Sequence, residues 1–308
     1  MAFRRHTWWK IFLIFFLLCP ITFAFLVSQF GQQIGMLKRS TVETFNTFRL
    51  EIIPIDVILV LWFHLLVYIW HLMWIIYVIV CIFRKTTCAY IYQLPVYPSA
   101  MLILMAVNLF ANAGWLIAFD QYVLEGSLIL SVLSFFSLSV SLCLAYKHLH
   151  DLDTLMRRLE LQKDIWLIRI LIHEGLAFYG ALLVTSTLIN LCMCMSFRWN
   201  VGHMLSCLIA LSLLGSAMFT WFFLDNVLFP SYTQWTLSPY IVFIVTLCGM
   251  LYRSYDLRLR FSVSVFLVCL LVFASLALGT KIATLGYRLC MANRKKKEKL
   301  LSGEHPQN

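Results

Sequence analysis

Residues Trp166–Met195 read WLIRILIHEGLAFYGALLVTSTLINLCMCM. At about 1.5 Å of rise per residue, this apolar stretch is longer than the roughly 20 residues that a helix needs to cross a bilayer. Its polar residues include Arg169, His173 and Glu174 near the start and Asn190 near the end. In hydrocarbon, such groups face a neighbouring helix or a cavity. We therefore predict an inner helix around which other spans pack, either as an ordinary packing helix with one charged end or as a helix that faces a ligand.

The composition of the whole chain extends this prediction. Of its 308 residues, 62% are hydrophobic and only 12% are charged, whereas soluble domains average about 25% charged residues. The fold class that follows is all-α, a polytopic transmembrane helical bundle. The ten cysteines show neither a CxxC pair nor metal-ligand spacing. The P-loop, GxGxxG and HExxH motifs are absent from the sequence, so no motif argues for an enzyme.

Apolar stretches divide the chain into about eight spans. They lie at roughly 11–30, 56–83, 98–119, 127–146, 166–195, 203–225, 237–252 and 262–284. We expect a cytosolic N-terminus (1–10), a five-span bundle (11–198), an additional three-span segment (199–286) and a basic, disordered cytosolic tail (287–308). The loop 147–163 is predicted to be a short amphipathic helix that lies on the membrane or caps the bundle.

The distribution of basic residues gives the orientation, since Lys and Arg concentrate on the cytosolic side. With a cytosolic N-terminus and alternating spans, 7 of the 24 Lys and Arg residues fall on the far side and the other 17 on the cytosolic side. The seven are Lys38, Arg39, Arg49, Arg198, Arg253, Arg258 and Arg260. Both termini are therefore predicted to be cytosolic. The net charge of +10 follows from this topology and does not indicate a nucleic-acid partner.

Two spans carry the side chains that are most relevant to binding. In the second span, His64, Tyr68 and His71 share one stripe of the helix, and Trp70 and Trp74 lie on another. Paired histidines in a membrane helix raise the possibility of a haem or metal site, but hydrogen-bonded or interfacial histidines explain the pattern more simply. In the third span, Asn108 and Asn112 are four residues apart, and Trp115 follows three residues later. Buried amides must be paired, so this face is expected to point inward, toward the Asn190 side of the fifth span.

Two of these stretches resemble the TspO/MBR family of tryptophan-rich sensory and translocator proteins. Members carry Asn-x-x-Trp in the third helix and an Ala-Thr-x-Leu-Asn-like pattern in the fifth. Here Asn112-Ala-Gly-Trp115 corresponds to the first motif and Ser186-Thr187-Leu188-Ile189-Asn190 to the second. The similarity covers roughly residues 11–198 in the family order, and the three later spans are extra. Members usually have a tryptophan near the position of Leu182.

The resemblance implies a hydrophobic planar ligand, a tetrapyrrole or a sterol or other lipid, bound within the five-span bundle. Aromatic faces for stacking, with a few inward polar groups for orientation, fit such a ligand. The candidate ligand-binding residues are Trp70, Trp74, Asn112, Trp115, His173, Tyr179 and Asn190. No metal or resident cofactor is predicted, and a porphyrin is considered only as a ligand. The expected partners are the bilayer of an endomembrane or the plasma membrane, the hydrophobic small molecule and, as an open alternative, further copies of the chain.

Two alternatives stay open. The first is a small-solute transporter in which Arg169, His173, Glu174 and Asp225 form an intramembrane charge pathway. Against it, the sequence shows no inverted repeat and no pair of Gly/Pro-broken helices. The second is an orphan receptor-like or structural membrane protein, although eight spans with both termini on one side do not match the seven-span receptor plan.

Overall fold

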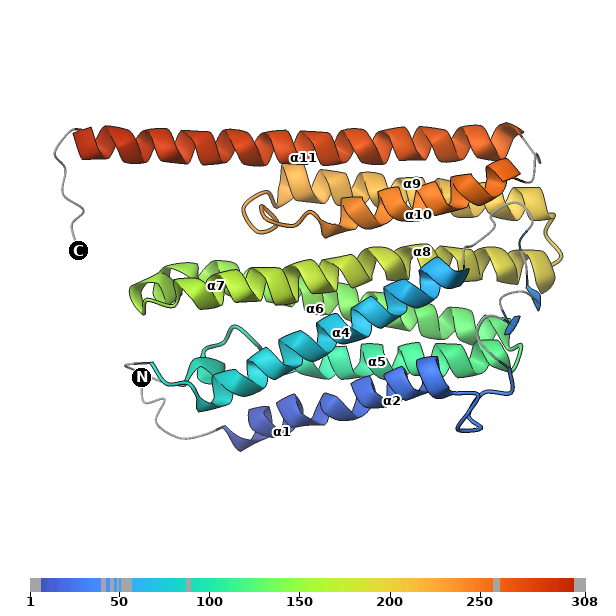
Figure 1. Cartoon of the computed structure of the whole chain (residues 1–308), viewed down its shortest axis with the longest axis horizontal. Coiled ribbons are helices and arrows are strands. Elements are labelled where there is room, and N and C mark those ends of the chain that lie inside the picture. The colour runs from blue at the N-terminus through green and yellow to red at the C-terminus, as the bar shows by residue number, and fades with distance from the viewer. Residues whose placement is uncertain are drawn as a thin grey trace.

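The protein is an all-α polytopic helical bundle, as a computed structural model shows (Figure 1). The structure describes residues 7–39, 43–44, 47–48, 50, 57–86, 90–256 and 261–301. Within these ranges, seven helices are long and apolar enough to cross a membrane, and the apolar helix Ser238–Tyr252 is shorter. Counting the shorter helix as a crossing gives the eight spans that hydropathy predicts.

The first span is interrupted near its middle. It consists of α1 (Trp8–Phe16) and α2 (Leu18–Phe30), and Leu17 separates them. Pro20 explains the break, because a proline lacks the backbone N–H and its ring crowds the carbonyl four residues earlier, here that of Phe16. The two helices together form one continuous apolar segment long enough to span the bilayer.

The next three spans form the centre of the bundle. They are α4 (Val57–Phe83), α5 (Ser99–Asp120) and α6 (Leu124–Arg158), and the short helix η1 (Ile91–Gln93) lies between α4 and α5. One face of α6 is a buried row of small hydroxyl side chains, which allows α5 to approach closely. This row consists of Ser127, Ser131, Ser134, Ser137 and Ser141.

Residues 147–158 are helical as predicted, but the prediction of a short helix distinct from the preceding span is wrong, because α6 continues without a break to Arg158. Neither glycine nor proline occurs between Lys147 and Arg158, so nothing in the sequence ends the helix where its hydropathy falls. The chain reverses at Glu160, whose φ is 58°. It returns through α7 (Gln162–Ile168), the π-helical turn η2 (Arg169–Glu174) and α8 (Gly175–Phe197).

The C-terminal part contains the last three spans. They are α9 (His203–Phe223), which ends in a second π-helical turn, η3 (Leu224–Leu228), then α10 (Ser238–Asp256) and α11 (Phe261–Leu301). The expected disordered tail is helical as far as Leu301, because the segment after Gly286 is rich in Lys, Arg and Leu, which are good helix formers. The end of the tail, residues 302–308, lies outside the described residues.

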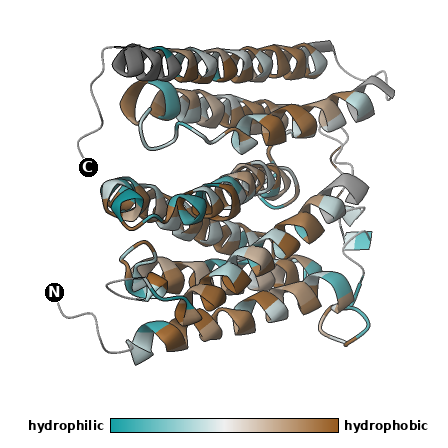
Figure 2. Cartoon of the chain, turned by 60° about the vertical axis from the view of Figure 1, so that its left-hand side comes forward, coloured by the Kyte–Doolittle hydropathy of each residue, from teal (hydrophilic) through white to brown (hydrophobic). Residues whose placement is uncertain are grey.

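The helices lie roughly side by side in layers (Figure 1). α1 and α2 lie along one side with α5, α4 crosses the bundle diagonally, α6 to α8 occupy the middle, and α9, α10 and then α11 form the other side. Apolar residues cover most of the helix surfaces (Figure 2). α1 begins and α11 ends at the same end of the bundle, which is the arrangement that an even number of crossings produces.

Candidate functional site

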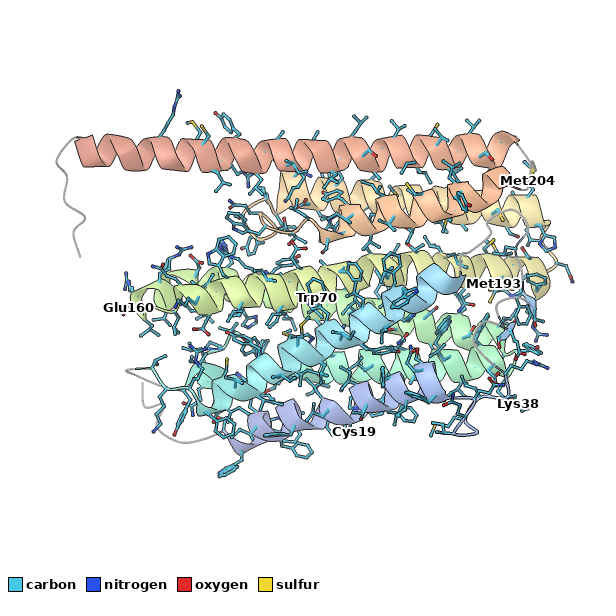
Figure 3. The ribbon with its side chains drawn as sticks, viewed as in Figure 1. Cys19, Lys38, Trp70, Glu160, Met193 and Met204 are labelled. Atoms are coloured by element: carbon cyan, nitrogen blue, oxygen red, sulfur yellow. The ribbon has the colours of Figure 1, made fainter. Side chains whose placement is uncertain are left out.

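Trp70 lies at the crossing of α4 and α8, near the middle of the bundle (Figure 3). Its indole Nε1–H donates a hydrogen bond to the carbonyl of Leu171 at 3.0 Å, and its ring stacks on Phe178 at a centroid distance of 6.0 Å. Leu171 belongs to the π-helical turn η2, where the widened backbone disturbs the regular ladder of hydrogen bonds. A Cβ on Gly175 would overlap the Trp70 ring, so glycine at this position is what lets α4 approach α8.

Next to Trp70, three aromatic side chains from α4 and α8 meet in the interior. His71 and Trp74 are each 1% exposed and Tyr179 is 2% exposed. The His71 ring lies 5.1 Å from the Tyr179 ring, edge to face, and 6.3 Å from the Trp74 ring. We call His71, Trp74 and Tyr179 the core cluster.

Each residue of the core cluster buries a polar atom for which the described part of the chain offers no hydrogen-bond partner. These atoms are His71 Nε2, Trp74 Nε1 and the Tyr179 hydroxyl. The Tyr179 hydroxyl lies near the side chains of Asn108 and Ser134, so it is the least isolated of the three atoms. A buried polar group without a partner is destabilising by about 1–3 kcal/mol, so three in contact are unusual.

The hydrogen bonding of His71 determines what the cluster can offer a ligand. His71 Nδ1 lies 2.8 Å from the carbonyl oxygen of Val67, which can only accept. The proton of a neutral ring is therefore on Nδ1, and Nε2 carries a lone pair. The core cluster thus presents one acceptor, one N–H donor on Trp74 and one hydroxyl on Tyr179.

Three of the predicted binding residues lie apart from this cluster. Asn112 donates to the Tyr68 hydroxyl at 3.2 Å, not to the Asn190 side of the fifth span as expected. The Trp115 ring stacks on Phe119 at 5.7 Å. Asn190 accepts a hydrogen bond from Ser127 at 3.1 Å, and it lies eleven residues beyond Tyr179, about 16 Å along the helix. The seven predicted residues are therefore distributed along the bundle.

His173, the remaining predicted residue, faces a different neighbour. It is 5% exposed, and its ring packs against the ring of Tyr146 on α6 at 4.4 Å. This contact introduces a second polar region, at the contact of α6 and η2 with the C-terminal helices. We call this region the junction. It consists of Tyr146, Glu174, Asp225, Thr236, Ser238, Tyr240 and Lys281.

Glu174 is the first anchor of the junction. Its two carboxylate oxygens accept hydrogen bonds from the backbone N–H groups of Leu237 at 2.8 Å and Ser238 at 2.9 Å. These N–H groups belong to the first residue of α10 and the residue before it, where a helix favours negative charge. The Ser238 hydroxyl donates back to the Glu174 carbonyl at 2.9 Å. Beside it, the Tyr146 and Thr236 hydroxyls are 2.7 Å apart.

The second anchor is a buried ion pair. Lys281 Nζ on α11 lies 2.5 Å from Asp225 Oδ1 in η3, with side-chain exposures of 4% and 0%. Tyr240 on α10 donates to the other carboxylate oxygen of Asp225 at 2.7 Å, and Lys281 also donates to the Thr233 carbonyl at 3.1 Å. The pair therefore joins all three C-terminal helices.

A third charged contact closes the end of the bundle where α4 finishes. Arg84 binds the carboxylate of Asp164 through both terminal nitrogens, at 2.5 and 3.0 Å, and the Tyr77 hydroxyl donates to the same carboxylate at 2.9 Å. This hydrogen bond to a carboxylate raises the pKa of the Arg84 guanidinium above its ordinary value.

The four charges of the predicted transport pathway have different environments in the structure. Arg169 pairs with Asp153 at 3.2 Å and lies over the Trp166 and Trp235 rings. Glu174 and Asp225 belong to the junction, and His173 borders it. The roles of Lys281 and Tyr240 were missed, although a lysine near the end of the predicted span 262–284 and a tyrosine near the start of the predicted span 237–252 were visible in the sequence.

Among the described residues, no group of three or more His, Cys, Asp or Glu side chains is arranged to hold a metal ion. Searches of family models, of curated proteins and of solved structures return no match to this chain. The chain is thus described by its own geometry: a multi-pass helical membrane bundle with an aromatic core cluster and a charged junction.

Proposed function

We propose that the protein binds a hydrophobic small molecule inside its membrane bundle, at the core cluster between α4 and α8. The observation that carries this proposal is the contact of three buried aromatic side chains that each keep a polar atom without a partner. A ligand with an apolar body and a polar group would cover the rings and supply a hydrogen-bond partner to these unpaired atoms.

The chemistry of the cluster narrows the ligand. A ligand hydroxyl, such as the single hydroxyl of a sterol, has the donor that His71 Nε2 lacks and the acceptor that the Trp74 N–H lacks. A tetrapyrrole offers N–H groups and carboxylates for the same atoms. Both classes agree with the resemblance to the TspO/MBR family, which is itself part of this proposal. We place both termini in the cytosol and the protein in an endomembrane or the plasma membrane, with a binding and not an enzymatic role.

The test is a binding titration on the purified protein in nanodiscs, with protoporphyrin followed by its absorbance and a fluorescent sterol analogue followed by its emission. We expect saturable binding, and we expect Trp74→Phe to weaken it at least tenfold. Trp62→Phe is the matched control, because Trp62 is 66% exposed. Trp115→Ala tests the other predicted position. Binding that is linear with ligand, or equal in wild type and Trp74→Phe, would refute the site.

A second function is favoured by the junction: transport of a small charged solute or proton past Glu174, Asp225 and Lys281. Ionisable groups inside a membrane protein commonly mark such pathways, and π-helical turns such as η2 and η3 recur at functional sites. Two measurements on proteoliposomes would favour transport: a pH change reported by a trapped dye, or the uptake of labelled ions. In either case, Asp225→Asn should abolish the signal. Equal flux in wild type and Asp225→Asn would exclude this pathway.

A further inference from the structure

Cys192 and Cys207 touch across the interface between α8 and α9. Their sulfur atoms are 3.5 Å apart, and both residues are 0% exposed. The two helices form a hairpin whose connection is Arg198–Gly202, so the two cysteines face each other near its closed end. Met193 and Met204, which lie next in sequence to Cys192 and near Cys207, mark the region in Figure 3.

The neighbouring cysteine on the same helix behaves differently. Cys194 is also 0% exposed, but its sulfur contacts the carbonyl of Leu124 at 3.1 Å. The other described cysteines include five exposed residues, Cys19, Cys143, Cys248, Cys269 and Cys290. Among the described cysteines, Cys192 and Cys207 are thus the pair whose sulfurs contact each other. Cys194 is the matched comparison, because it is equally buried on the same helix but its sulfur contacts a carbonyl.

The position of the pair along the bundle bears on its chemistry. Cys192 lies five residues before the end of α8 at Phe197, and Cys207 lies four residues after the start of α9 at His203. At 1.5 Å per residue, both are within about 8 Å of the end of their helices. That end also carries Lys38 (Figure 3) and is the side with few Lys and Arg residues, which the positive-inside rule places outside the cytosol. Disulfides form and persist in the oxidising compartments outside the cytosol.

We propose that Cys192 and Cys207 are oxidised to a disulfide that ties α8 to α9. Each thiol loses its proton. The thiolate of one cysteine attacks a sulfur of a carrier disulfide, either a protein disulfide or glutathione disulfide, and releases the first carrier thiol. The thiolate of the other cysteine then displaces the second carrier thiol, so one S–S bond forms in the protein and the carrier gains two electrons and two protons.

The geometry requires only a small adjustment. The sulfurs move from 3.5 Å to a bond length of about 2.05 Å, which is a shift that side-chain rotation of two cysteines on facing helices can supply. Because both sulfurs are buried in the folded hairpin, the exchange occurs while the hairpin packs. The bond joins the fifth span to the first of the three additional spans, and it is independent of the proposed ligand site.

The experiment is differential thiol labelling of the full-length protein in isolated cell membranes. Thiols are blocked in SDS with light iodoacetamide, the protein is reduced, newly exposed thiols are labelled with heavy iodoacetamide, and the peptides are analysed by mass spectrometry. We expect heavy label on Cys192 and Cys207 and light label on Cys194. A non-reduced digest should contain one linked peptide pair that disappears after reduction.

Two variants keep the result unambiguous. Cys194→Ser should leave the linked pair intact, and Cys192→Ser should convert Cys207 to light label. A parallel membrane sample of each variant is solubilised in mild detergent and run on size-exclusion chromatography, and only variants that elute as a monodisperse peak are compared. Light label on both Cys192 and Cys207 in the wild-type protein would overturn the proposal, and so would a linked pair that contains Cys194.

Discussion

The core cluster and the junction both use the helix that runs from η2 into α8, through Tyr179 and Glu174, and they treat buried polar groups in opposite ways. In the core cluster, the His71 ring packs against Trp74 and Tyr179, and each of these three uncharged side chains keeps a polar atom without a partner in the described residues. In the junction, both oxygens of Glu174 and both oxygens of Asp225 accept hydrogen bonds. The core cluster therefore has unused hydrogen-bonding capacity, whereas the two carboxylates of the junction have none.

This difference separates a binding role from an architectural one. An unused buried donor or acceptor is unfavourable until something satisfies it, so it favours a ligand. A saturated carboxylate gains little from a ligand but becomes strongly unfavourable if one partner is lost. We therefore expect changes in the junction to alter stability first, and changes in the core cluster to alter binding first.

The largest effect on stability is expected at Lys281. Lys281→Met leaves the fully buried Asp225 carboxylate without its counter-charge, and breaking one side of a buried pair typically destabilises a protein by about 3–5 kcal/mol. SDS-titrated unfolding in mixed micelles measures the change. The double variant Lys281→Met/Asp225→Asn removes both charges and should recover most of the loss. A Lys281→Met protein as stable as the wild type would show that the junction is not a saturated network.

The next effect is expected at Glu174, which tests whether the junction couples the five-span bundle to α10. Glu174→Ala leaves the Leu237 and Ser238 N–H groups without their acceptors, at about 1–3 kcal/mol for each orphaned group that stays buried. Glu174→Gln keeps one oxygen acceptor and should recover part of the loss. The same unfolding titration applies, with the exposed Glu160→Ala as control. Equal stabilities of the Glu174→Ala and Glu160→Ala variants would show that Glu174 does not couple the five-span bundle to α10.

Most of the fold could be predicted from hydropathy, because each span is an apolar run of bilayer length. The ends of α6 and α11 could not, because hydropathy marks where the bilayer ends and says nothing of where a helix ends: Lys147–Arg158 contains no residue that would stop a helix. In the site, Trp74 and Tyr179 were predicted and meet through His71. The partner of Asp225 was not predicted, because Lys281 is 56 residues away and only tertiary packing joins them.

A smaller effect is expected where the two regions join. Gly175→Ala adds a Cβ that overlaps the Trp70 indole, whereas Gly180→Ala on the same helix adds one in ordinary contact with Leu138 at 3.8 Å. Overpacking typically destabilises by about 1–3 kcal/mol, so Gly175→Ala should be less stable than Gly180→Ala. The difference in unfolding free energy between the two variants is the measurement. When Trp70 is already Ala, the added Cβ has no ring to overlap, so Gly175→Ala should lower the unfolding free energy less than it does in the wild type. An equal loss in both backgrounds would place the strain elsewhere.

The smallest effect is expected at Tyr179, and it compares the two regions most directly. Tyr179→Phe removes a buried hydroxyl that makes no hydrogen bond in the described structure, so stability should stay within about 0.5 kcal/mol of the wild type or rise. Tyr240→Phe is the same chemical change at a hydroxyl that donates to Asp225 at 2.7 Å. A hydrogen bond to a charged group contributes about 1.5–3 kcal/mol, so this variant should be clearly less stable. Under the ligand proposal, Tyr179→Phe should weaken binding of the sterol analogue while Tyr240→Phe leaves it unchanged. Equal losses of stability in both variants would mean that the Tyr179 hydroxyl already has a partner in the membrane, and the distinction between the core cluster and the junction would fail.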